Sequence, residues 1–156
     1  MNSAPDFYPT DIDCAWLASD ADGVVAMFLT AGRAPVPERC FDNAGAPLEE
    51  IEEQLMRMEP CYKARLLVPV KRPEGYMDAA HRGFVVYDWT DVHKTRATKT
   101  HSYERVAVPE NPLRVDALPS PLALAAKAVR LDGISFATTS WIPTAALHPY
   151  RARPKE

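Results

Sequence analysis

The sequence predicts an α+β fold in a single domain, with a mostly antiparallel sheet of about five to six strands and two helices. Apolar runs of strand length outnumber helical patterns, the two kinds of element do not alternate regularly, and the chain holds 15 prolines against 6 glycines. Because proline can neither donate to a strand ladder nor continue a helix, the elements should be short. The length of 156 residues fits one hydrophobic core spanning residues 1–156.

The first expected elements are a hairpin and a helix. Residues 14–18 and 24–30 are apolar runs around an Asp/Gly turn, in which Gly23 supplies the positive φ that such a loop requires. Residues 48–58 should form a helix, because apolar residues recur three or four apart on one face, namely Leu48, Ile51, Leu55 and Met58.

The later elements follow the same two periodicities. A second helix should run to Leu131, with Ser120 at the N-cap and Pro121 at the first helical position. The connection at 71–82 has room for one short helical turn, and residues 143–156 should form a peripheral tail. Runs rich in β-branched and aromatic residues predict the remaining strands, at 62–70, 83–89, 103–109 and 134–142.

The N-terminus and the cysteines indicate the compartment. The start, MNSAPDFYPTDID, has neither a basic nor an apolar region of the kind found in export signals, and the chain has no run of about 18 apolar residues. Its three cysteines lack CxxC spacing, which argues against a disulfide framework or a zinc ribbon. We expect a cytoplasmic protein with reduced thiols and no membrane span.

The charges are divided unevenly along the chain. Residues 1–60 carry 12 acidic and 3 basic residues, whereas residues 61–156 carry 9 acidic and 15 basic ones, which together give the net charge of −3. The two parts either interleave and cancel in the fold, or leave one acidic and one basic face. Only separate faces would indicate a charged partner.

The acidic part offers a candidate partner-binding surface. Carboxylates gathered on one face would steer and bind a basic protein, although a solvated helix face is the simpler alternative. A calcium site in the first turn is disfavoured, because a calcium loop starting at Ala18 would place Leu29 where a glutamate ligand is needed. The candidate residues are Asp20, Asp22, Glu49, Glu50, Glu52 and Glu53.

The stretch HKTRATKTH, residues 93–101, is the second candidate site. It combines cations with hydroxyl groups, which suits a phosphate, but it has no glycine to let its backbone amides wrap around one. His93 and His101 would lie about 26 Å apart on an extended strand, too far to share a metal ion. The alternatives are a solvated connection or a phosphate-binding site formed by Lys94, Arg96, Lys99 and His101.

No catalytic signature is present. Ser140 and His148 could be written as part of a triad, but no G-x-S-x-G elbow surrounds the serine. A pI of about 5.8 is the wrong sign for an unaided nucleic-acid binder. The sequence therefore leans away from an enzyme, names no catalytic residue, and points to no metal and no cofactor.

One segment carries a family resemblance. The sequence WLASDADGVVAMFLTAG (Trp16 to Gly32), with the later PVP at 35–37, resembles the N-terminal part of bacterial immunity proteins, which are encoded beside secreted polymorphic toxins. This segment covers less than a fifth of the chain. The resemblance implies a cytoplasmic α+β protein that binds and blocks a toxin, often through acidic groups, and that has no catalytic residues of its own.

Two functional hypotheses follow. The first is an immunity-type inhibitor that neutralises a basic protein through the acidic surface. The second is an enzyme or a ligand-binding domain that holds a phosphate-bearing small molecule through the 93–101 stretch. An inhibitor should present a broad acidic face without a pocket, whereas the second class requires a cavity into which the basic side chains converge.

Overall fold

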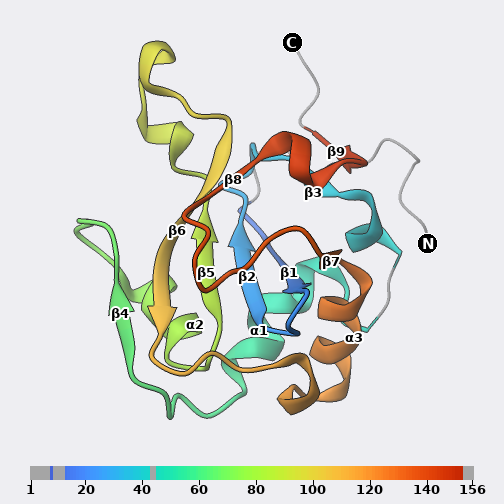
Figure 1. The fold of residues 1–156 in the computed structure, drawn as a ribbon. Helices are drawn as coiled ribbons and strands as arrows, with labels where there is room; N and C mark the ends of the chain where they lie inside the picture. Colours follow the sequence, from blue (N-terminus) through green and yellow to red (C-terminus); the bar gives the residue numbers. More distant parts are fainter. Residues whose placement is uncertain (1–7, 9–12, 43–44, 153–156) are drawn as a thin grey trace.

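The computed structural model describes residues 8, 13–42 and 45–152, and it confirms the α+β class. Its centre is a seven-stranded sheet in the order β4-β6-β5-β2-β1-β7, with β8 paired to β6 (Figure 1). The strands are β1 Ala15–Asp20, β2 Val25–Leu29, β4 Ala64–Leu66, β5 Val85–Asp88, β6 Ser102–Pro109, β7 Arg130–Leu131 and β8 Trp141–Pro143.

The sheet is mixed and has more strands than the sequence predicts. The expected hairpin forms from β1 and β2, and the pairs β4–β6, β5–β6 and β6–β8 are also antiparallel. The pairs β1–β7 and β2–β5 are parallel. Because β2 and β5 run side by side in the same direction, the segments that follow these two strands emerge at the same edge of the sheet.

Three helices pack on one face of the sheet: α1 Ile51–Met56, α2 Glu74–Ala80 and α3 Ser120–Ala128. Ile51 and Leu122 bury apolar side chains against Leu17 and Met27, which point to this face from the β1–β2 hairpin. The sequence predicts α1 and α3, but the structure makes both shorter, since residues 48–50 form a 3-10 turn and α3 ends at Ala128. The expected single turn near Ala80 is the complete helix α2.

Aromatic side chains fill the other face. Trp16 stacks on Phe28 at 3.9 Å between ring centroids, and Phe28 stacks on Tyr87 at 4.9 Å. Tyr103 packs edge-on against Trp16. The strand register places Trp16 opposite Phe28 and Phe28 opposite Tyr87, and residues directly opposite each other project to the same face of a sheet.

The C-terminal part covers the aromatic face, in contrast to the peripheral tail that the sequence predicts. Leu147 is 2% exposed and packs against these aromatic side chains. The short strand β9, Tyr150–Arg151, pairs with β3, Val36–Pro37. The strand expected over 134–142 is also largely absent, since only 141–143 pairs with the sheet, while residues 153–156 of the expected tail lie outside the described part.

The connection between β5 and β6 projects from the body of the molecule (Figure 1). It contains two 3-10 turns, Thr90–His93 and Arg96–Thr98, and includes the basic stretch. Elsewhere in the chain, none of the helices that the structure describes has the length and apolar character needed to cross a bilayer.

Candidate functional site

Asp20 is buried at the end of β1 and is only 1% exposed. Its carboxylate accepts backbone N–H groups from Asp22 at 2.9 Å, Val24 at 3.0 Å and Phe136 at 3.0 Å. These bonds fix the β1–β2 turn and tie residue 136 to it. The expectation that Asp20 belongs to an exposed partner-binding surface is therefore wrong, because backbone amides use the carboxylate inside the fold.

Asp22 is exposed, but arginines from the basic part of the chain surround its turn. Arg114 donates to the carbonyl of Asp22 at 2.6 Å, and Arg130 donates to the carbonyl of Ala21 at 3.3 Å. Two guanidinium groups therefore bind the backbone of this turn. The acidic and basic parts of the sequence interleave at this turn.

The glutamates form a smaller acidic group around the start of α1. Glu49, Glu52 and Glu53 are exposed and Glu50 is half-buried. Partial burial and the nearby Asp13 carboxylate raise the pKa of Glu52. Since Asp13 precedes β1 and Asp22 follows it, the six-residue strand separates the two by about 20 Å. The six predicted residues therefore do not form one acidic surface.

The basic stretch forms one wall of a cavity of about 280 Å³. Three of the four predicted anion-binding residues, Lys94, Lys99 and His101, lie along it. Arg96 does not line this cavity, since it sits in the outer 3-10 turn and is exposed. The lining residues are Arg33, Trp89, Asp91, Val92, Lys94, Lys99 and His101.

Sequence reasoning missed Arg33. This residue follows β2 in a turn closed by hydrogen bonds from Arg33 N–H and Ala34 N–H to the Thr30 carbonyl, at 3.1 and 3.0 Å. The parallel register places Leu29 opposite Asp88, so the turn after β2 lies beside the segment after β5. No local signal marks Arg33, because about sixty residues of sequence separate it from Lys94.

Asp91 organises the basic wall. Its carboxylate accepts the backbone N–H groups of Thr100 at 2.9 Å and His101 at 2.8 Å, and lies 3.8 Å from the Lys94 ammonium. Burial raises the pKa of Asp91, but these hydrogen bonds outweigh it and hold the pKa below its usual value. In a glycine-rich loop, the conformational freedom of glycine lets the chain turn around a ligand. Here the Asp91 carboxylate holds the turn instead, by accepting two backbone N–H groups.

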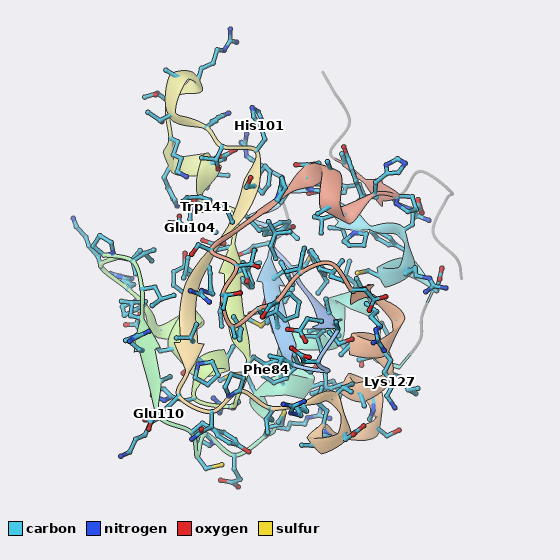
Figure 2. The ribbon with its side chains drawn as sticks, in the orientation of Figure 1. Phe84, His101, Glu104, Glu110, Lys127 and Trp141 are labelled. Atoms are coloured by element: carbon cyan, nitrogen blue, oxygen red, sulfur yellow. The ribbon has the colours of Figure 1, made fainter. Side chains whose placement is uncertain are left out.

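Lys94 also contacts an exposed aromatic ring. Its ammonium lies 4.7 Å from the centroid of the Trp141 ring, within the range of a cation–π contact. Trp141 is 41% exposed, and Figure 2 shows it and His101 at the base of the projecting segment. Lys94 therefore connects the cavity to the exposed indole ring of Trp141, which does not itself line the cavity.

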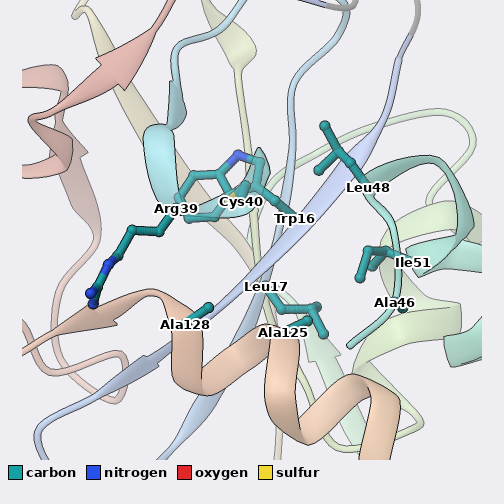
Figure 3. Close-up of a pocket in the computed structure, with 9 residues that line it drawn as sticks. All are labelled: Trp16, Leu17, Arg39, Cys40, Ala46, Leu48, Ile51, Ala125 and Ala128. Atoms are coloured by element: carbon teal, nitrogen blue, oxygen red, sulfur yellow. The ribbon is translucent and has the colours of Figure 1, made fainter. Parts of the chain in front are cut away.

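The cavity in Figure 3 is a packing gap. It lies between the sheet, the 3-10 turn Glu38–Phe41 and α3, with Trp16, Leu17 and Ala125 among its lining residues. Its volume of about 10 Å³ is close to the minimum that holds one water molecule. It is too small for a ligand.

Tyr76 on α2 and Asp88 on β5 form a hydrogen-bonded pair of titratable side chains. The Tyr76 hydroxyl donates a hydrogen bond to the Asp88 carboxylate at the end of β5. Burial raises the pKa of Asp88, although the bond from Tyr76 opposes that shift.

Burial also raises the pKa of the Cys14 and Cys40 thiols, which disfavours the thiolate form that a nucleophile requires.

The chain matches no family model, no curated protein and no solved structure.

The basic side chains of Arg33, Lys94 and Lys99 line the cavity together with one carboxylate, that of Asp91, so this lining carries net positive charge. Such a wall suits an anion with several acceptor oxygens, because charge-assisted hydrogen bonds are the strong ones. Among the residues that the structure describes, no group of three histidine, cysteine, aspartate or glutamate side chains is arranged to hold a metal ion.

Proposed function

We propose that this protein binds a phosphate-bearing small molecule in the cationic cavity. The observation that carries the proposal is the convergence of Arg33, Lys94, Lys99 and His101 on one cavity of about 280 Å³ from two segments far apart in the sequence. Asp91 holds Thr100 and His101 in place beside this cavity through their backbone N–H groups. A cavity of this size fits a small ligand better than a protein surface.

Direct binding of a matched pair of ligands tests this proposal. Titration calorimetry with ribose 5-phosphate and with ribose should show binding of the phosphate ester alone. The double variant Lys94→Gln and Lys99→Gln should weaken that binding by at least about tenfold, since each charge-assisted hydrogen bond contributes about 1.5–3 kcal/mol. Added salt should weaken it further.

The matched control replaces two exposed lysines outside the cavity, Lys71→Gln with Lys127→Gln. This control has the same net charge as the double cavity variant, so it removes any effect of overall charge. Equal binding by the two double variants, or no binding of ribose 5-phosphate to the unmodified chain at millimolar concentration, would show that the cavity is not a phosphate site.

A second candidate is the immunity-type inhibitor, with a smaller interface than the sequence suggests. The observation that favours it is that Glu49, Glu52 and Glu53, all exposed, lie within five residues of one another around the start of α1. The candidate interface of this inhibitor consists of three exposed residues, Glu49, Glu52 and Glu53. Such a group would recognise basic side chains of a toxin.

Charge reversal tests this candidate. If a toxin-like protein is encoded beside the gene, replacing Glu49, Glu52 and Glu53 by lysine should weaken its binding at least about tenfold, or about 1.4 kcal/mol. Asp116→Lys, at an exposed position in another 3-10 turn, serves as the control. A smaller loss would exclude this face as the interface.

A further inference from the structure

The exposed indole ring of Trp141, beside the cavity, indicates which phosphate-bearing molecules the cavity would bind. Lys94 touches both parts of this region, since it lines the cavity and its ammonium lies 4.7 Å from the centroid of Trp141. An anion bound by Lys94 is therefore placed next to the indole ring. The phosphate site and the ring are within reach of one small molecule.

The backbone fixes the position of Trp141 relative to the cavity. Strand β8 pairs with β6 so that Trp141 lies opposite Glu104 and Pro143 opposite Ser102. The carbonyl of His101, a cavity residue, accepts the Thr144 backbone N–H at 3.1 Å and the Thr144 hydroxyl at 2.9 Å. The ring and the cavity are thus held on one rigid sheet edge.

Burial alternates along β8 in a way that leaves the indole open. Ile142 is fully buried among the aromatic side chains, while Trp141 points away from that core and is 41% exposed. Because the Lys94 ammonium already lies over the ring at 4.7 Å from its centroid, the flat ring of a ligand can cover only the part of the indole that remains exposed. Stacking of a base on such a ring tolerates any base, because every base has a π-face.

We infer that the ligand is a nucleoside monophosphate whose phosphate lies among Arg33, Lys94 and Lys99 and whose base stacks on Trp141. This inference rests on the proposed phosphate-binding function and adds that the base of the ligand stacks on the Trp141 ring. Lys94 is the shared element, since its ammonium faces the phosphate while its contact with the indole keeps the two groups together.

The experiment compares AMP with ribose 5-phosphate, which lacks only the base. In calorimetric titrations of the full chain, AMP should bind about tenfold more tightly, the gain expected from stacking one base. Trp141→Leu should remove this preference, measured as the ratio of the AMP affinity to the ribose 5-phosphate affinity on the same variant, because Trp141 also contacts Lys94. Trp141→Phe should keep part of it, because a smaller ring remains.

The control variant is Leu124→Ala, which removes an exposed apolar side chain from α3, an element separate from β8. It should leave the AMP preference intact. If Trp141→Leu does not fold, the comparison of the two ligands on the unmodified chain and the Trp141→Phe variant still test the ring.

Failure of this inference is distinguishable from failure of the phosphate site. Equal binding of AMP and ribose 5-phosphate, or an AMP preference that survives Trp141→Leu, would overturn the role of the ring and leave the phosphate site standing. Tighter binding of a short single-stranded oligoadenylate than of AMP would overturn the assignment to a free nucleotide. If neither AMP nor ribose 5-phosphate binds, the proposed function and this inference fall together.

Discussion

The carboxylate of Asp91 accepts the backbone N–H of His101 at 2.8 Å and holds that residue at a φ of 52°. This region of backbone space favours glycine, and a side chain there costs about 1–2 kcal/mol. Asp91 is 2% exposed, so its hydrogen bonds are shielded from water. The pair closes the β5–β6 connection and gives the cationic cavity its wall.

Removing the Asp91 carboxylate should loosen this connection. We expect Asp91→Ala to lower the free energy of unfolding by about 1–3 kcal/mol, because two backbone N–H groups lose a buried acceptor. The amides of Thr100 and His101 should also exchange hydrogen faster, as NMR can measure residue by residue. Because the folded-state pKa of Asp91 is lowered, its contribution is present above about pH 4 and is lost as the pH falls through the folded value. Unchanged exchange at both amides would contradict this role.

Arg82 is expected to be the most sensitive charged residue. Its buried guanidinium donates to the carbonyls of Met58 at 2.9 Å, Asp78 at 2.9 Å and Met56 at 3.3 Å, and so joins the end of α1 and the residues just after it to α2. Arg82→Met should destabilise the protein by about 2–4 kcal/mol in urea unfolding, since those carbonyls lose their partner.

The matched control for Arg82 is Arg57→Met. Arg57 forms an exposed ion pair with Glu53 at 3.5 Å, and exposed pairs contribute less than about 1 kcal/mol. If both variants lose a similar free energy of unfolding, the hydrogen bonds from Arg82 to the three carbonyls do not stabilise the protein more than an exposed ion pair does.

The hydrogen-bonded pair Trp16 and Tyr103 stabilises the aromatic face. The Trp16 indole donates to the Tyr103 hydroxyl at 3.1 Å, and that hydroxyl donates to the Pro35 carbonyl at 2.8 Å. Tyr103→Phe should cost about 1–3 kcal/mol in the free energy of unfolding, because it leaves a buried donor and a buried acceptor unpaired. Tyr87→Phe, which removes a single bond to the Thr139 carbonyl, should cost less. The reverse order would count against this network.

Two glycines should respond in opposite ways to alanine. Gly83 has a φ of 97°, and an added Cβ would lie 2.4 Å from Leu113 Cγ, so Gly83→Ala should destabilise by about 2–4 kcal/mol. Gly75 lies in α2, where an added Cβ meets nothing within 4 Å, and Gly75→Ala should stabilise by about 0.5–1 kcal/mol. Urea midpoints for both variants measure the difference, and a stabilising Gly83→Ala would refute the packing argument.

Asp88 should oppose folding as it ionises. Burial raises the folded-state pKa of Asp88, so its unfavourable contribution grows as the pH rises from about 4 through the folded pKa. Asp88→Asn removes the charge and keeps an oxygen for the Tyr76 hydroxyl. The stability of this variant relative to the unmodified chain should therefore increase with pH over that window, as denaturation at several pH values can show. A difference independent of pH would indicate that Asp88 does not titrate as described.

The predicted acidic surface was wrong because the sequence does not show where each charge lies in the fold. The chain order of charges is visible in the sequence, but the position of each charge depends on pairing between distant segments. Asp20 looks like a turn carboxylate until Phe136, more than a hundred residues later, donates its N–H to it. Arg114 and Arg130 reach the same turn from the second half of the chain.

The sequence by itself determined the local elements, because strand and helix periodicity, proline positions and turn residues act over a few neighbours. The β1–β2 hairpin, the helix around Ile51 and the helix starting at Ser120 follow from these. Only the tertiary structure decided the rest. The parallel pairing of β2 with β5 brought Arg33 to the basic stretch, and Asp91 converted that stretch from a connection into the wall of a cavity. The strand pairing depends on residues far apart in the chain, and the Asp91 contacts span up to ten residues of irregular backbone, so no helix or strand periodicity encodes either of them.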